Sequence, residues 1–335
     1  MAKKSFKYAM LEALQWEMQR DKDMFYLFEF GNPNASAEGL PDISLEKEFG
    51  QFRANHSGLD EYWYIGCALG AGLIGIRAIA EIPSMTTVVP FEMICFHAAR
   101  LRHMSGGQVT FPTVMIVDES GQGAGSAGQH SCYEVDSYYA HIPGLKVVVP
   151  ATPYDAKGLM HAAIRDPDPI LWINPGGCGR LTEEVPDEAY EVPIGKAAIR
   201  TEGEDLTIVS SGNGMPFVLK AVEKLQEEGI SVETIDLRSL KPMDTETLVA
   251  SVQKTGRLLT MDESPYTLCP GAEVIARVAE QVPGVHFTRI AFPDAPPPAG
   301  WEMFNYMKPN DTHVYDAAHI LLGKGGSGGG VAMKK

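Results

Sequence analysis

The stretch LKVVVPATPYDAKGLMHAAIRDPDPILWIN, residues 145–174, decides the fold class. An apolar run at 145–150 is followed by a helical segment at 155–166 and by a second apolar run at 169–174. Continuous apolar runs are typical of strands buried on both faces of a parallel sheet, with helices between them. The stretch therefore predicts a strand–helix–strand unit in an α/β fold.

The same alternation extends in both directions from this unit. Before it, strands are predicted at 24–30, 77–82 and 113–117, and helices at 5–20, 60–75 and 88–103. After it, strands are predicted at 205–211, 231–237, 257–263 and 285–292, and helices near 215–228, 244–254 and 271–282. The chain is therefore expected to form two α/β domains.

The boundary between the two series lies in a segment rich in glycine, proline and acids, with little periodicity. We predict a first domain over residues 1–180, a linker over 181–204 and a second domain over 205–322. The glycine-rich tail at 323–335 is expected to be disordered.

Composition excludes several classes of protein. The 335 residues carry 43 acids against 28 bases, a net charge of −15, and no basic block, so nucleic acid is not expected as a partner. No apolar run reaches the roughly 18 residues of a membrane span. Five cysteines without a C-x-x-C pair indicate neither a zinc ribbon nor a disulfide framework. A reducing, cytoplasmic location fits best.

A glycine-rich loop, GQGAGSAGQHSC (121–132), follows the strand predicted at 113–117. Its glycines match the dinucleotide pattern G-x-G-x-x-G, but they do not open an apolar helix. No acid ends the strand that lies about 20 residues further on, as that pattern requires. The loop either delivers His130 to a reacting centre, binds a dinucleotide, or is glycine-rich only for flexibility.

Two acids, Asp60 and Glu61, open the helix predicted at 60–75. Acids are favoured in a first helical turn because they complement its free N–H groups, so either acid is a plausible cap. However, Glu61 precedes Tyr62, Trp63 and Tyr64, which predicts a partly buried carboxylate. Burial raises the pKa of such a group and allows it to share a proton with a ring nitrogen.

Several motifs together resemble one family, the β subunit of the thiamine-diphosphate-dependent E1 component of 2-oxo acid dehydrogenases. The pyruvate, branched-chain and acetoin enzymes belong to it. The motifs are MSGGQ (104–108), GQHS (128–131), HIPGLKVVVP (141–150), DAKGLMHAAIRDPDP (155–169), GKA (195–197), IDLRSLKPMD (235–244) and SVQKTGRLL (251–259). The resemblance covers about residues 5–322. It implies a transketolase-like pyrimidine-binding domain followed by a smaller transketolase C-terminal domain.

The resemblance also implies site residues. Glu61 matches the family glutamate that contacts N1′ of the cofactor's aminopyrimidine and favours the imino tautomer. His130 matches an active-site histidine that assists substrate positioning or proton transfer. Glu29 matches a glutamate near the same face of the cofactor, and Thr87 stands where an aromatic residue commonly packs near the aminopyrimidine. The loop at 121–132 thus resembles one that presents a histidine.

The diphosphate of this cofactor is normally held through a metal by a G-D-G motif, and this chain has none. The family supplies that half of the site, with Mg²⁺, from an α subunit in an α2β2 heterotetramer, so this chain alone is expected to be inactive. The family's β subunit also binds a structural potassium ion, for which oxygen ligands are suited. The matching positions here are Val114, Ala163, Ile164, Asp166 and Asp168; an ordinary helix C-terminal turn is the alternative.

Departures from the family pattern lie around the active site. His56, Ser57 and Gly58 replace the usual D-T-P before the catalytic glutamate, Val117 stands where arginine is common, and Phe28 and Phe30 flank Glu29 where glycine and aspartate are usual. We therefore expect an E1-like enzyme with an atypical substrate, and His56 as a second ionisable group near the cofactor.

Three functions are consistent with these observations. The first is decarboxylation of a 2-oxo acid, or cleavage of an acyloin, with acyl transfer to a lipoyl group on an E2 partner. The second is a non-oxidative thiamine-diphosphate lyase or ketol transferase that needs no lipoyl acceptor. The third is a non-catalytic assembly subunit, against which the retained Glu61 and His130 argue.

Overall fold

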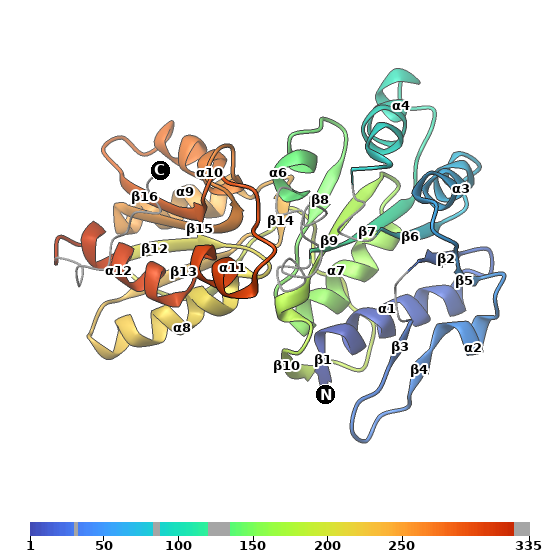
Figure 1. Cartoon of the computed structure of the whole chain (residues 1–335), viewed down its shortest axis with the longest axis horizontal. Coiled ribbons are helices and arrows are strands. Elements are labelled where there is room, and N and C mark those ends of the chain that lie inside the picture. The colour runs from blue at the N-terminus through green and yellow to red at the C-terminus, as the bar shows by residue number, and fades with distance from the viewer. Residues whose placement is uncertain (30–32, 83–87, 120–134, 325–335) are drawn as a thin grey trace. The chain divides into compact units, whose positions relative to one another are not determined.

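The chain forms two compact units in the computed structural model (Figure 1). The first consists of Met1–Ser120 and Tyr138–Ile194, and the second mainly of Gly195–Lys335. The structure describes residues 1–29, 33–82, 88–119 and 135–324. Both units alternate strands with helices, which confirms the predicted α/β fold class.

The first unit is built on a parallel sheet whose strands run in the order β8-β9-β7-β6-β2-β5. Two short antiparallel pairs, β1-β10 and β3-β4, accompany it. The strands are β1 (Ala2–Ser5), β2 (Phe25–Phe28), β3 (Asn34–Ala35), β4 (Ile43–Ser44), β5 (Ala54–His56), β6 (Ala78–Ile82), β7 (Thr113–Glu119), β8 (Lys146–Val148), β9 (Ile170–Pro175) and β10 (Thr182–Val185). The helices are α1 (Phe6–Arg20), α2 (Leu45–Phe49), α3 (Glu61–Leu73), η2 (Met93–Ala98), α4 (Ala99–Met104), α6 (Val135–Ala140), α7 (Pro153–Arg165) and η4 (Gly176–Cys178). The first residues of α6, including Asp136, belong to the second unit.

Burial explains why the apolar runs form central strands. Ile170, Leu171, Trp172 and Ile173 of β9 are all fully buried, because helices cover both faces of the sheet. In Figure 1, α1 and α7 lie on one side of this sheet, and α3 and α4 lie on the other. No helix in the described part of the chain combines the length and apolar character needed to cross a membrane.

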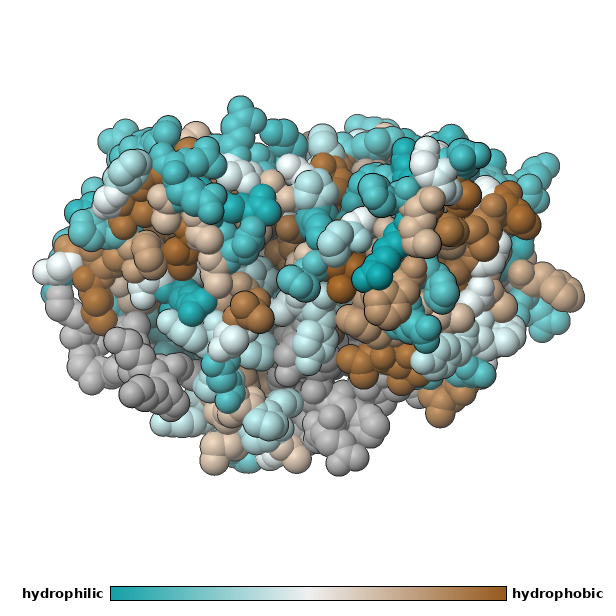
Figure 2. All heavy atoms as spheres, turned by 90° about the horizontal axis from the view of Figure 1, so that it is seen from above, coloured by the Kyte–Doolittle hydropathy of each residue, from teal (hydrophilic) through white to brown (hydrophobic). Residues whose placement is uncertain are grey.

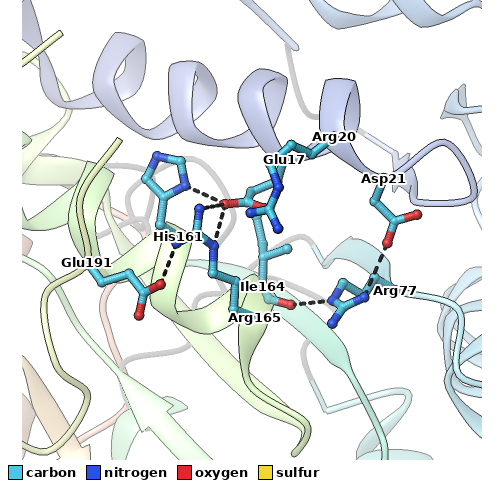
Figure 3. A network of polar contacts seen from close by, with 8 residues as sticks. All are labelled: Glu17, Arg20, Asp21, Arg77, His161, Ile164, Arg165 and Glu191. Carbon is cyan, nitrogen blue, oxygen red and sulfur yellow. Dashed lines mark hydrogen bonds and ion pairs between the residues drawn. The ribbon is translucent and has the colours of Figure 1, made fainter. Parts of the chain in front are cut away.

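A buried polar network ties α1 to α7 (Figure 3). One carboxylate oxygen of Glu17 lies 2.7 Å from Nδ1 of His161 and accepts a hydrogen bond from Nε of Arg165 at 2.8 Å. His161 is completely buried and the Glu17 side chain is 5% exposed, so this carboxylate has exchanged water for two protein partners. Arg165 also pairs with Glu191, which fastens the segment after β10 to α7.

The second unit has a five-stranded sheet with the order β11-β13-β12-β15-β16, in which β11 alone is antiparallel. Helices α8 and α12 pack together on one face, and α9 and α10 on the other. The strands are β11 (Ala198–Thr201), β12 (Leu206–Ser210), β13 (Val232–Asp236), β14 (Ser239–Lys241), β15 (Arg257–Pro265) and β16 (His286–Phe292). The helices are α8 (Gly214–Glu227), α9 (Thr245–Thr255), α10 (Pro270–Ala279), α11 (Trp301–Met307) and α12 (Asp311–Leu321).

The segment predicted as a linker, 181–204, is not wholly irregular. It contributes β10, paired with β1, to the first unit and β11, paired with β13, to the second. Short edge strands of this kind carry no apolar periodicity, so the sequence does not reveal them. The domain limits at 180 and 205 remain predictions.

Candidate active site

The carboxyl ends of two neighbouring parallel strands bring Glu29 and His56 to the same edge of the sheet. β2 pairs with β5 so that Phe28 lies opposite His56. Glu29 follows β2 directly, and Ser57 follows β5. The backbone N–H and the hydroxyl of Ser57 both donate to the carbonyl of Phe28, at 2.8 and 3.2 Å. Open α/β sheets bind ligands at this edge.

Helix α3 starts at the same edge. It connects β5 to β6, which lie on opposite sides of β2, so it crosses over the strand that carries Glu29. Asp60 is the N-cap, and its side chain accepts a hydrogen bond from the Trp63 N–H at 3.0 Å. A short polar side chain in this position satisfies one free N–H of the first turn and so starts the helix.

Glu61, the first residue of α3, has a different environment. It is 7% exposed, and its oxygen Oε1 is buried without a hydrogen-bond partner. The predicted burial of this carboxyl is therefore confirmed, and Asp60 rather than Glu61 does the capping. An unpartnered buried oxygen is costly, and such groups are often kept for a ligand.

Glu29 is the second buried carboxyl, 3% exposed. Its Oε2 accepts a hydrogen bond from the Tyr64 hydroxyl at 3.2 Å, and its Oε1 has no partner. Burial raises the pKa of Glu29; the Tyr64 hydrogen bond opposes this, the negative charge of Glu61 reinforces it, and the charge of His56 again opposes it. The net direction is upward, so Glu29 holds a proton more strongly than an exposed glutamate.

His56 is exposed at the end of β5, with its ring edge-on to Phe28 at a centroid distance of 5.5 Å. It is close enough to Glu29 to affect the pKa of that carboxyl. His130 and Thr87, the other two residues predicted at this site, lie outside the described residues, as do the whole glycine-rich loop at 121–132 and Phe30.

The predicted potassium positions surround the turn between α7 and β9. Asp166 accepts two hydrogen bonds from Nζ of Lys146, both at 2.7 Å, and Asp168 pairs with Lys146 and Arg102. The carbonyl of Ile164 accepts from Nε of Arg77 at 3.1 Å. The carboxylates of this turn thus already have cationic partners. Ala163 and Val114 are buried nearby, at the end of α7 and in β7.

Sequence reasoning missed Tyr64 as part of the site. Tyr64 lies three residues after Glu61 on α3, and side chains at this spacing share one helix face. The spacing therefore predicts that the side chain of Tyr64 contacts the same neighbours as the side chain of Glu61. Its bond to Glu29 depends on the pairing of β2 with β5 and could not be read from the chain.

Known protein families match both units. The transketolase pyrimidine-binding domain matches residues 2–175, and the transketolase C-terminal domain matches residues 195–314. The pyruvate dehydrogenase E1 component subunit beta of Rhizobium meliloti is 37% identical over 332 residues, covering 97% of this chain and 71% of the relative. The chain belongs to the E1 beta-subunit family.

Further relatives of this E1 beta-family chain agree. The pyruvate dehydrogenase E1 component subunit beta of Acholeplasma laidlawii is 36% identical and covers 92% of this chain and 95% of the relative. The acetoin:2,6-dichlorophenolindophenol oxidoreductase subunit beta of Cupriavidus necator is 39% identical, with coverages of 85% and 86%. These matches confirm the predicted family and the order of its two domains.

A solved structure confirms the fold. A chain described as "Split gene transketolase, inactive beta4 tetramer" superposes on this E1 beta-family chain with a TM-score of 0.77. It covers 95% of this chain and 98% of its own length at 22% identity. The likeness supports the transketolase-like architecture.

Family membership implies thiamine diphosphate as the cofactor. The described residues fit an aminopyrimidine, because two buried carboxyl oxygens, Oε1 of Glu61 and Oε1 of Glu29, lack protein partners. A nitrogen heterocycle offers the donors and acceptors that such oxygens require. In the same described residues, no three histidine, cysteine or acidic side chains gather as a metal site.

Proposed function

We propose that this chain is the beta subunit of an E1-like enzyme that decarboxylates a 2-oxo acid, or cleaves an acyloin, and passes the acyl group to a lipoyl acceptor. The observation that carries the proposal is the pair of buried, unpartnered carboxyl oxygens at the edge of the pyrimidine-binding sheet. Other buried polar atoms of the chain, such as Nε2 of His161, also lack a partner. These two oxygens differ because they lie together at the edge where open α/β sheets bind ligands.

In this proposal Glu61 holds a proton against a ring nitrogen of the cofactor, and its burial keeps water from competing for that proton. Glu29 lines the same face. His130 positions the substrate or transfers a proton to the acyl acceptor, and Thr87 lies near the aminopyrimidine. Thiamine diphosphate, when bound, supplies the electron sink for cleavage of the bond beside the carbonyl.

The partner is an alpha subunit that contributes Mg²⁺ and the diphosphate half of the site, in an α2β2 assembly. The chain contains no G-D-G sequence of its own. The exposed face of α3 fits such a partner, because Trp63, Leu73 and Ile74 are 49%, 51% and 75% exposed. Figure 2 shows hydrophobic residues gathered on the side of the molecule where α3 and α4 lie.

Between α3 and the helical segment η2–α4 the same face is hollowed by an open apolar cavity of about 310 Å³. Leu69, Leu73, Met93, Phe96 and Leu101 line it. Large exposed apolar surface of this kind marks protein interfaces. Helix α3 begins at Glu61 and also carries this apolar face. A subunit that docks on the face would therefore cover the apolar surface and complete the cofactor site at the same time.

The proposal includes a structural potassium ion at the turn between α7 and β9. Since the carboxylates of Asp166 and Asp168 are engaged by Lys146 and Arg102, the ion would be held by main-chain carbonyls of the turn and of Val114. The carbonyl of Ile164 would then share the ion with Arg77. The test compares thermal unfolding of the chain in potassium, sodium and choline chloride at equal ionic strength. A melting temperature that is the same in all three salts would remove potassium from the proposal.

One observation favours an atypical substrate. His56, Ser57 and Gly58 replace the D-T-P of the family, and the charge of His56 then lies close enough to Glu29 to affect its pKa. A non-oxidative lyase or ketol transferase is therefore the alternative. The His56→Ala variant is expected to change substrate preference within a panel of 2-oxo acids and acyloins. Unchanged turnover and preference would remove His56 from the site.

The first experiment isolates this chain from its own cell extract and measures the native mass of what accompanies it. A 2:2 complex with a partner that bears a G-D-G motif, together with the mass of thiamine diphosphate, supports the E1 proposal. Dependence of its turnover on added lipoyl domain then separates the dehydrogenase from the lyase. A homodimer without cofactor favours a non-catalytic subunit.

A further inference from the structure

Tyr64 links the two carboxyl groups of the candidate site. It is completely buried, and it lies one turn after Glu61 on α3. Its hydroxyl donates to Oε2 of Glu29 at 3.2 Å. The bond crosses from α3 to the end of β2, so the helix that carries one carboxyl also holds the other in place.

This hydrogen bond distinguishes the two oxygens of Glu29. Because Oε2 accepts from Tyr64, a proton on the Glu29 carboxyl resides on Oε1, the oxygen without a protein partner. A protonated Oε1 is a hydrogen-bond donor. Without Tyr64, the carboxyl is free to rotate, and either oxygen can carry the proton.

Burial has the largest effect on the pKa of Glu29 and raises it, the Tyr64 hydrogen bond opposes this, and the charged groups around Glu29 modify it further. Glu61 faces it from α3 and disfavours a second negative charge, whereas His56 faces it from β5 and favours one. Glu81 of β6, which is hydrogen-bonded to Tyr26 of β2, adds negative charge near Tyr64. Burial adds to the effect of the acids. The net direction is a raised pKa, so Glu29 holds its proton more strongly than an exposed glutamate does.

We propose that Tyr64 is a positioning residue that orients Glu29 so that Oε1 donates a hydrogen bond to an acceptor on the ligand bound beside Glu61. The acceptor is a carbonyl oxygen or an unprotonated ring nitrogen, since both offer a lone pair without a negative charge that would require a cationic partner. The identity of the ligand rests on the proposed function; the orientation of Glu29 by Tyr64 does not.

The test is an infrared pH titration of the full-length chain without cofactor, following the stretching band of a buried protonated carboxyl. The band is assigned by its loss in Glu29→Gln. In Tyr64→Phe the titration midpoint is expected to move to higher pH, because the hydrogen bond that stabilises the charged form is gone, and the band to move to higher frequency. Tyr8→Phe is the matched control, since Tyr8 is also buried and its hydroxyl donates to the carbonyl of Pro41 at 2.9 Å rather than to Glu29.

A band and midpoint in Tyr64→Phe that equal those of the wild-type chain overturn the proposal. If Tyr64→Phe does not fold, Glu29→Ala reads the same bond from the other side, through the tyrosine C–O stretch, because it removes the acceptor oxygen that Glu29→Gln would keep. An unchanged tyrosine spectrum in that variant overturns the proposal equally. Neither measurement requires turnover, so an inactive complex would count against the proposed function and leave this test readable.

Discussion

At the scale of single residues, two neighbouring acids at the start of α3 have separate tasks. Asp60 is exposed, and its carboxylate is engaged with the N–H of Trp63. Glu61 is buried, with one free oxygen. Stabilisation of the helix end therefore accounts for Asp60. It does not account for the buried Glu61, whose free oxygen indicates a ligand.

This difference predicts opposite outcomes for two substitutions. Glu61→Gln keeps the shape but removes the exchangeable proton, so the turnover of the assembled enzyme should fall by about 10²-fold or more, with little change in stability. Asp60→Ala should lower the free energy of unfolding by about 1 kcal/mol and keep most of the turnover. Initial rates and urea unfolding measure both. Full activity in Glu61→Gln would exclude the assigned role.

The sequence alone locates part of this site and not the rest. The burial of Glu61 could be predicted because Tyr62, Trp63 and Tyr64 follow it directly. The proximity of Glu29 to Glu61 came only from the resemblance, since 31 intervening residues carry no information about distance. The bond from Tyr64 to Glu29 is a tertiary contact at an edge where two strands happen to be neighbours, and it has no local signature.

Among the elements, α1 and α7 are joined by the buried Glu17 carboxylate and its partners His161 and Arg165 (Figure 3). Glu17→Ala should lower the free energy of unfolding by about 2–3 kcal/mol, because it leaves the buried Nδ1 of His161 without its partner and leaves Arg165 with only Glu191. The surface pair of Glu273 and Arg277 is the control, and Glu273→Ala should cost under about 1 kcal/mol. Equal losses measured by denaturant unfolding would contradict this.

Two glycines of α3 have different surroundings, so their substitution tests internal packing and partner binding separately. A Cβ on Gly72 would lie 2.7 Å from Oγ1 of Thr113, whereas one on Gly70 would meet nothing within 4 Å. Gly72→Ala should therefore destabilise the chain. Gly70→Ala should stabilise it by about 0.5–1 kcal/mol, through better helix propensity, and weaken binding of the alpha subunit. Thermal unfolding of the chain and titration with the partner measure the two effects. Unchanged partner affinity in Gly70→Ala would remove this face from the interface.

Elements with strong apolar patterns were predicted well, and weak ones were not. The central strands β6, β7 and β9 were predicted because buried parallel strands are apolar throughout. Strand β5 was missed, since its three residues, Ala54–His56, have no pattern beyond one buried alanine. The helix expected at 88–103 contains a π-helical stretch, η2, whose wider turn no local sequence rule announces.

At the scale of the whole molecule, buried acids in the second unit make stability depend on pH. Burial, together with the charge of Asp136, raises the pKa of Asp262 to about 7 from 3.8. The folded chain thus binds more protons than the unfolded chain between those values. The contribution of Asp262 to stability is complete below about pH 4 and is lost as the pH rises to about 7.

Asp262→Asn should therefore flatten the fall in the free energy of unfolding between about pH 4 and pH 7. Asp294→Asn is the control, since hydrogen bonds from Thr267 lower the pKa of that exposed carboxyl and its contribution is lost only in acid. Denaturant unfolding at intervals of pH measures both slopes. A wild-type slope in Asp262→Asn would show that Asp262 is ionised in the folded chain.

The uncovered apolar face of α3 has a consequence for how the cell must make this protein. In the free chain, both the cofactor half-site and the interface are open. Binding of the partner stabilises the folded chain, and this stabilisation increases with the concentration of the partner. Molecules made in excess expose Trp63, Ile74 and their neighbours, which favours self-association and degradation. The amount of folded beta chain should accordingly follow the supply of the alpha chain, so that synthesis of the two in equal numbers is itself part of what keeps the enzyme intact.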